Sequence, residues 1–336
     1  MEFKKFNSIE NSYRTKFLNK IVEEGHGNKE YVVTEKIHGA NFSFWVDDFK
    51  IATGKRSGLN GDKENFNGSQ GLVKKYYSHL RALFEYVKTD RNAKEVAIFA
   101  EIFGGGYNHK EVQRDIHATR VQKGVEYCPQ NAVVCYDLMI DGILQDVDEC
   151  NRLLDLFGIP RAETLFRGSL EDCLKYPNKY ITTIPKLLGL PEIADNVCEG
   201  NVIRPSQATY LWSGERLILK NKNEKFKEKQ DEPKRLKDTP KGLTDDAKAV
   251  LEQALTYLND NRLRNVLSKL GAIEPGDFGK IMGNLTHDLM EDFSKDHGDI
   301  LEALDQDSRK QLGKQLGMNA ALLVRKNFAN ILDNNF

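Results

Sequence analysis

The sequence lacks several features that would place it in a special class of protein. It has no run of 18 or more apolar residues, so it predicts no membrane-spanning helix, and its N-terminal stretch lacks the apolar core of a signal peptide. Its five cysteines include no Cys-x-x-Cys pair, which argues against a disulfide framework or a zinc site and favours reduced thiols in a cytosolic protein. The formal net charge of −1 shows no global excess of basic residues, so any surface that binds nucleic acid must be local.

What the sequence does contain, up to about residue 230, is short β-like runs mixed with a few helices. Seven segments rich in Val, Ile, Phe, Tyr or Trp predict strands at 31–36, 42–47, 50–53, 96–102, 132–140, 201–205 and 216–222. Helices are expected at 11–24, 71–88, 146–157 and 169–175. Because many strands are close together in sequence, we expect an α+β domain with antiparallel sheets and flanking helices rather than regular βαβ units.

The pattern of apolar residues changes from β-like to helical after a charged stretch. Residues 220–237 carry eight Lys or Arg against four Asp or Glu, which is typical of a solvated linker. Thr244 is a credible N-cap, and apolar residues follow it at helical spacing. Further helices are expected at 260–270, 276–282, 284–296 and 305–333. The predicted organisation is a first domain at 1–230, a linker at 231–243 and a small all-helical domain at 244–336.

The stretch Glu35-Lys36-Ile37-His38-Gly39-Ala40-Asn41 is the most informative motif. It places Lys36 at the end of a β-rich run, just before a His-Gly pair, where the sheet can partly desolvate the amine and the glycine lets a phosphate approach the backbone. An amine nucleophile must lose its proton, so burial and nearby cations have to disfavour its charged form. Alone, the same pattern fits a surface lysine at a strand end.

Other phosphate and metal motifs are excluded. Residues 53–58 faintly resemble a P-loop, but Phe49 stands where that motif requires its first glycine. No dinucleotide-type glycine fingerprint follows a strand, and the histidines are too scattered for a metal-binding helix.

Further candidate residues are spread along the first domain. Arg56 follows a strand and can reach a phosphate or ribose, and Glu101 ends a strand where its carboxylate can accept from a ribose hydroxyl. Tyr136 lies in an apolar strand, where it either stacks on a base or is an ordinary core residue. Glu199 opens a strand and can hold a magnesium ion.

Lys220 and Lys222 stand at i and i+2, so in a strand their amines point to one face. Two ammonium groups on an inward face need a compensating anion, whereas at an edge strand they are merely solvated.

The order of these motifs resembles the covalent nucleotidyltransferase superfamily of ATP-dependent ligases and capping enzymes, and most closely the bacteriophage RNA ligase 2 family. The resemblance rests on Glu-Lys-x-His-Gly-x-Asn, on Lys55-Arg56-Ser57-Gly58, and on Leu219-Lys220-Asn221-Lys222-Asn223 with Lys225-Phe226. Asn265–Gly271 and Asp277-Phe278-Gly279-Lys280 in the C-terminal region also match. The fold it implies is an ATP-grasp-like nucleotidyltransferase domain followed by the helical domain.

The resemblance implies an ATP-dependent RNA ligase that seals 3′-hydroxyl/5′-phosphate breaks. Lys36 would attack the α-phosphorus of ATP and become lysyl-AMP, the adenylate would pass to an RNA 5′-phosphate, and a 3′-hydroxyl would then displace AMP. Lys220 and Lys222 would neutralise the α-phosphate, Glu199 would coordinate Mg²⁺ or Mn²⁺, and His38 would act after adenylylation of the lysine.

The remaining implied roles concern nucleotide and RNA binding. Glu101 would fix the ribose, Tyr136 would stack on adenine, and Arg56 and Asn41 would contact the ribose or the RNA phosphate, with Glu35 and Ile37 flanking the nucleophile in the nucleotide site. Two departures from the family pattern are Ala40, where a threonine is common, and Arg204, where a lysine is typical.

The expected partner is nicked duplex RNA or an RNA–DNA hybrid, bound by a monomer in the cytoplasm of a host cell if phage-encoded. A capping guanylyltransferase shares the lysine chemistry but would carry an OB-fold after the Lys-x-Lys strand. A non-catalytic RNA-binding module that retains the fold is the other alternative.

Overall fold

The computed structural model describes residues 1–229 and 243–336, which form two compact units, Met1–Lys225 and Phe226–Phe336. Each unit is described by itself. The predicted linker at 231–243 lies, apart from residue 243, outside the described residues, so the domain boundaries drawn from the sequence remain a prediction.

The first unit contains two sheets. One has the strand order β1 (Glu10–Asn11), β11 (Leu219–Lys222), β10 (Gly200–Pro205), β2 (Tyr31–Glu35) and β9 (Thr164–Gly168). The other has the order β5 (Gly58–Leu59), β4 (Ile51–Lys55), β3 (Ala40–Asp47), β6 (Glu95–Gly106), β7 (Cys128–Ile140) and β8 (Ile143–Leu144). All pairs are antiparallel except β1 with β11. The predicted α+β class with antiparallel sheets is thus confirmed.

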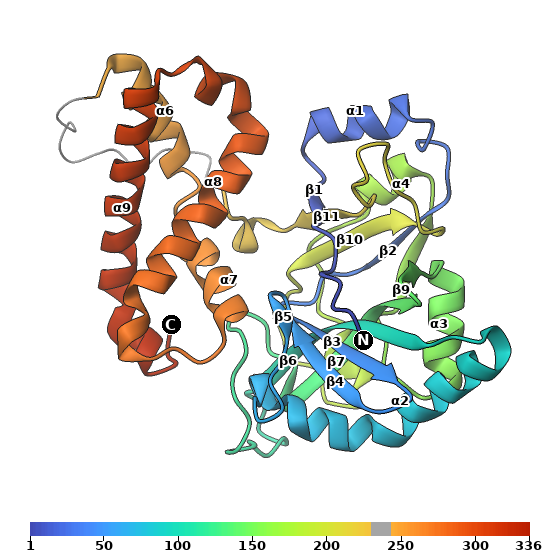
Figure 1. Cartoon of the computed structure of the whole chain (residues 1–336). Helices are drawn as coiled ribbons and strands as arrows, with labels where there is room; N and C mark the ends of the chain where they lie inside the picture. The colour runs from blue at the N-terminus through green and yellow to red at the C-terminus, as the bar shows by residue number, and fades with distance from the viewer. Residues whose placement is uncertain (230–242) are drawn as a thin grey trace. The chain divides into compact units, whose positions relative to one another are not determined.

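Helices cover these sheets because each presents one apolar face. The long helix α2 (Ser69–Arg91) lies along the six-stranded sheet (Figure 1), and with α3 (Val147–Leu156) it encloses the main apolar core of this unit. Leu80, Leu83, Phe84 and Val87 of α2 are fully buried in that core. The five-stranded sheet packs against α1 (Thr15–Glu23) and α4 (Leu170–Lys175), and α5 (Ile184–Leu187) follows in the chain.

The second unit is helical throughout its described length, as predicted, with α6 (Asp245–Leu255), α7 (Asp260–Leu270), α8 (Phe278–Ala303) and α9 (Gln306–Leu332). Thr244 caps α6 by accepting from the backbone N–H of Ala247 at 3.3 Å, as its position in the sequence indicates. The prediction of separate helices at 276–282 and 284–296 is wrong. Buried Ile281 and Leu285 on either side of Gly283 favour a continuous helix, and the backbone leaves helical geometry only at His297, beside Gly298.

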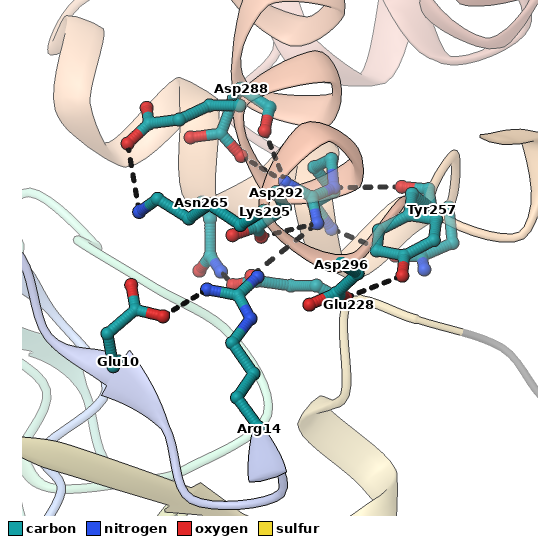
Figure 2. A network of polar contacts seen from close by, with 12 residues as sticks. Glu10, Arg14, Glu228, Tyr257, Asn265, Asp288, Asp292, Lys295 and Asp296 are labelled. Carbon is teal, nitrogen blue, oxygen red and sulfur yellow. Dashed lines mark hydrogen bonds and ion pairs between the residues drawn. The ribbon is translucent and has the colours of Figure 1, made fainter. Parts of the chain in front are cut away.

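A buried arginine holds α7 and α8 together. The Arg262 guanidinium is 1% exposed and donates to Asp292 at 2.8 Å, to Asp288 at 2.5 Å and to the Tyr257 carbonyl at 2.8 Å. Figure 2 shows Asp288, Asp292 and Tyr257 close together, with their contacts drawn as dashed lines. Because a buried guanidinium is costly without such partners, the network fixes how the two helices pack.

Candidate active site

The ends of three adjacent strands bring the candidate nucleophile and its charged partners together. Lys36 directly follows β2, and its backbone N–H donates to the carbonyl of Gly200 at 2.8 Å, which extends the pairing of β2 with β10 by one residue. Gly200 is in turn the sheet partner of Lys222 in β11. The register of the sheet therefore sets Lys36, Glu199 and Lys222 side by side.

Gly200 allows this close approach of β10 to β11. Its φ of +147° suits glycine, and a Cβ there would lie 2.1 Å from the carbonyl oxygen of Asn221.

Glu199 is the centre of the site. Its side chain is 1% exposed, and Oε2 lies 2.9 Å from Nζ of Lys36 and 3.2 Å from Nδ1 of His38, while Oε1 lies 2.8 Å from Nζ of Lys222. Burial alone would raise the pKa of this carboxyl, but Lys222, Lys36 and His38 hold the pKa well below its usual range. Glu199 is therefore a buried carboxylate anion that compensates two ammonium groups.

His38 is fixed on three sides. Its backbone N–H donates to the hydroxyl of Tyr127 at 2.8 Å, and its ring nitrogens face two acceptors, Glu199 and the carbonyl of Lys123, the latter at 3.1 Å. A neutral imidazole has one N–H, so both ring contacts are hydrogen bonds only in the imidazolium form. The segment 122–127 thus braces the loop that carries Lys36.

Gly39 packs against the strand that holds Glu101. A Cβ at Gly39 would lie 2.2 Å from the carbonyl oxygen of Ile102 and 2.9 Å from Cγ of Glu101, so only glycine fits. Burial raises the pKa of the Glu101 carboxyl to about 7, where Lys36 acts to lower it and Glu199 to raise it. Glu101 consequently shares the electrostatic environment of the Lys36–Glu199 pair.

Tyr136 and Asn41 form the adjoining part of the site. In the pairing of β6 with β7, Phe99 aligns with Asp137 and Ala100 with Cys135, so Tyr136 is an extra residue in a β-bulge. Its hydroxyl accepts from the Asn41 side chain at 2.6 Å. Its half-buried ring meets Phe6 edge-on, with 5.0 Å between centroids.

Arg56 lies beside the N-terminal segment. Its guanidinium donates to the carbonyl of Phe6 at 2.9 Å and to the hydroxyl of Ser8 at 3.3 Å. It also acts on the pKa of Tyr136, which burial raises well above the usual value and Arg56 partly lowers.

Not every residue selected from the sequence faces this centre. The Glu35 carboxylate accepts from the Thr182 hydroxyl at 2.5 Å and from the backbone and hydroxyl of Thr183 at 2.8 Å each. Burial raises its pKa, and these hydrogen bonds partly offset the effect. Ile37 is 5% exposed. Lys220 is half-buried in β11 and, two residues from Lys222, lies on the same face of that strand.

The sequence did not indicate the residues that contact and position the side chains of the site. Tyr127 and Lys123 fix His38, Thr182 and Thr183 bind Glu35, and Phe6 contacts Tyr136. These residues belong to loops or to the N-terminal segment, and only the apolar spacing of Phe3 and Phe6 could have indicated that this segment packs on a sheet.

A divalent cation fits this site only together with ligands from a substrate. No group of three metal-ligating side chains occurs in residues 1–229 and 243–336. Glu199 supplies one buried carboxylate, and Mg²⁺ is commonly held by one or two carboxylates plus substrate phosphates and water. The donor set is consistent with a metal–triphosphate complex and not with a metal cage made by the protein alone.

Comparisons with known proteins identify the family to which the chain belongs. The RNA ligase family model matches residues 29–222, and the model of the T4 RNA ligase 2 C-terminal domain matches residues 241–321. The mitochondrial RNA-editing ligase 2 of Trypanosoma brucei brucei is 26% identical over 385 residues, covering 98% of this chain and 92% of that protein. RNA-editing ligase 1 of the same organism is 26% identical over 220 residues, covering 56% of this chain and 47% of that protein.

Solved structures of the RNA ligase of Naegleria gruberi are also similar. A mutant without ligand has 14% identity and a TM-score of 0.44 over 65% of this chain and 55% of its own, so the match spans little more than half of that protein. A mutant with ATP and Mn has 14% identity and a TM-score of 0.46 over 67% of this chain and 58% of its own.

The chain belongs to the RNA ligase family. It is an RNA ligase by family, and its C-terminal unit is of the T4 RNA ligase 2 type. The expected phage origin finds no support, because the similar ligases above come from a trypanosome mitochondrion, and the host cytoplasm remains a prediction. None of the described helices has the length and apolar character needed to cross a membrane.

Proposed function

We propose that this protein seals 3′-hydroxyl/5′-phosphate nicks in duplex RNA or RNA–DNA hybrids through lysyl-AMP and adenylylated RNA. The observation that carries the proposal is the shared carboxylate of Glu199, which holds Lys36 and Lys222 at 2.9 and 2.8 Å. This arrangement keeps two cations at the point where a triphosphate would place its negative charge.

In the first step, the Lys36 amine attacks the α-phosphorus of ATP, a P–N bond forms, and the P–O bond to pyrophosphate breaks. Lys36 is paired with Glu199, so it must leave this carboxylate and give up its proton before it attacks. Glu199 would hold a divalent cation together with the triphosphate, and that cation would supply positive charge to offset the phosphates. Lys222, with Lys220 from the same strand, then pairs with phosphate oxygens.

In the second step, an oxygen of the RNA 5′-phosphate attacks the lysyl-AMP phosphorus and Lys36 leaves as an amine. His38 is well placed to support this step, since it contacts Glu199 and is anchored by Tyr127 and Lys123. In the third step, the 3′-hydroxyl attacks the activated 5′-phosphate, and AMP leaves. Each step passes through added charge at phosphorus, which nearby cations stabilise.

The nucleotide would lie along the β3–β6–β7 face. Tyr136 would stack on adenine, Glu101 would accept from the ribose, and Asn41 and Arg56 would contact the ribose or the RNA phosphate. Ile37 would contribute through the backbone of the nucleophile loop. Glu35, whose carboxylate faces Thr182 and Thr183, would act by holding the end of β2 rather than by touching phosphate.

The helical C-terminal unit argues against a capping enzyme, which would carry an OB-fold at this place in the chain. Binding would depend on local basic surface, since the net charge is −1, and would weaken steeply with salt.

The test is a sealing assay with nicked duplex RNA, a nicked RNA–DNA hybrid, single-stranded RNA and nicked DNA, each with a 5′-phosphate. We expect sealing of the first two to be fastest and to require ATP. Preferred sealing of nicked DNA, or label transfer from GTP and not ATP, would contradict the proposal. Lys36→Arg provides the inactive control.

A further inference from the structure

Asp137, Arg204 and Arg216 form a buried ionic cluster between the two sheets of the first unit. Asp137 lies in β7 of the six-stranded sheet, Arg204 lies in β10 of the five-stranded sheet, and Arg216 lies just before β11. Oδ2 of Asp137 accepts from Nη1 of Arg204 at 2.9 Å and from Nη1 of Arg216. The three side chains are 1%, 7% and 3% exposed.

The cluster holds two guanidinium groups on one carboxylate. Buried ion pairs carry a desolvation cost, and two guanidinium groups on one carboxylate leave a net positive charge in the interior. The second contact of Arg204 suggests a further role, because its Nη2 donates to the carbonyl of Tyr136 at 2.6 Å.

Tyr136 is the extra residue of the bulge in β7, the position at which a bulge redirects a side chain. Arg204 binds the backbone carbonyl of Tyr136 and also the carboxylate of the neighbouring Asp137. Arg204 therefore constrains the bulge from the opposite sheet. A planar guanidinium can bridge two acceptors in this way, whereas a lysine offers a single ammonium group.

We propose that Arg204 is a positioning residue for nucleotide binding, which holds the Tyr136 bulge so that the ring keeps the orientation needed to stack on a base. The inference rests on the proposed adenine site and adds a residue from the other sheet to it.

The test compares Arg204→Met with a matched control, Arg216→Met. Each change removes one guanidinium from Asp137 and leaves one balanced ion pair, but only Arg204→Met removes the contact with the Tyr136 carbonyl. The equilibrium dissociation constant of AMP measures binding that includes the adenine base. Competition by inorganic tripolyphosphate, which has no base, measures binding at the phosphate site alone.

We expect Arg204→Met to weaken AMP binding about tenfold, the scale of a lost base–aromatic stack, and Arg216→Met to change it about twofold or less. The inhibition constant of tripolyphosphate should be the same in the wild type, Arg204→Met and Arg216→Met. An Arg204→Lys variant, which keeps the charge, should also bind AMP more weakly than the wild type.

The outcomes separate this inference from the proposed function. Unchanged AMP binding in folded Arg204→Met, equal losses in both methionine variants, or failure of both Arg204 variants to fold would overturn the positioning role. A wild-type protein that forms no adduct with ATP, yet shows the expected AMP pattern, would overturn the ligase chemistry and leave the positioning role standing. Circular dichroism and thermal melting establish which variants fold.

Discussion

The Nζ atom of Lys36 lies 2.9 Å from Oε2 of Glu199, so the candidate nucleophile is ion-paired with a buried carboxylate. The same carboxylate also holds Lys222, so one buried anion balances two lysine side chains. When the nucleotide binds, its phosphates must therefore replace Glu199 as the ion-pair partner of Lys36 and Lys222.

Glu199→Gln should lower the rate of lysyl-AMP formation by about 10²-fold, the effect expected when one preorganised charge is removed from a site. The change keeps the shape of the side chain but removes the negative charge proposed to hold a divalent cation together with the triphosphate. Single-turnover adenylylation with labelled ATP measures the rate. Asp148→Asn, which alters an exposed carboxylate, is the matched control, and equal rates in the two variants would contradict a special role of Glu199.

The free energy of unfolding should depend on pH through Glu101. Burial raises the pKa of this carboxyl to about 7 in the folded protein, against 4.5 for the reference group. Between these values the folded state keeps a proton that the unfolded state has lost, so stability falls as pH rises from about 4.5 to about 7, by at most about 3 kcal/mol.

Urea unfolding from about pH 5 to about pH 8 checks this dependence, with Glu101→Gln as the comparison. Because glutamine does not titrate, the variant should lose this component and gain stability relative to the wild type as the pH rises. Parallel pH profiles for the two proteins would show that Glu101 does not titrate in this range.

Gly39→Ala should destabilise the protein by about 1–3 kcal/mol, because the new Cβ would overlap the Ile102 carbonyl and Glu101. The strain falls on the loop of the nucleophile, so adenylylation should also slow. Gly71→Ala is the control: it adds the same methyl group in helix α2, where nothing lies within 4 Å, and should be neutral or slightly stabilising. Equal effects of the two changes on urea unfolding would refute the steric argument.

Tyr136→Ala should raise the KM for ATP by about tenfold or more, because it removes the aromatic face proposed for adenine. Tyr136→Phe keeps that face and loses only the hydrogen bond from Asn41, so its KM should stay within about threefold of the wild type. Steady-state sealing assays with nicked RNA at varied ATP concentration give both values. If the phenylalanine and alanine variants behaved alike, the hydroxyl rather than the ring would be the important group.

The sequence predicted the parts of the site that follow from strand order. Lys36 ends one strand, Glu199 precedes another, and Lys222 lies in a third, and local β patterns were enough to identify all three strands. The pairing of β2, β10 and β11 could not be read from periodicity, because contacts between residues 36, 199 and 222 depend on long-range register.

Other features depend on tertiary contacts that leave little local signal. The bulge at Tyr136 adds one residue to an otherwise regular apolar strand, and nothing in that strand marks where it occurs. Glu35 neighbours Lys36 in sequence, but its carboxylate binds Thr182 and Thr183. The break predicted at Gly283 failed for a related reason, since burial of the flanking apolar residues outweighs the helix propensity of one glycine.

The central claim is that Lys36 becomes covalently adenylylated, and mass spectrometry of proteolytic peptides tests it most directly. After incubation with ATP and Mg²⁺ or Mn²⁺, the peptide that contains Lys36 should carry one added adenylate, which should be absent from Lys36→Arg and should disappear when nicked RNA is added. An unmodified Lys36 peptide under these conditions, or an adenylate on a different residue, would contradict the account.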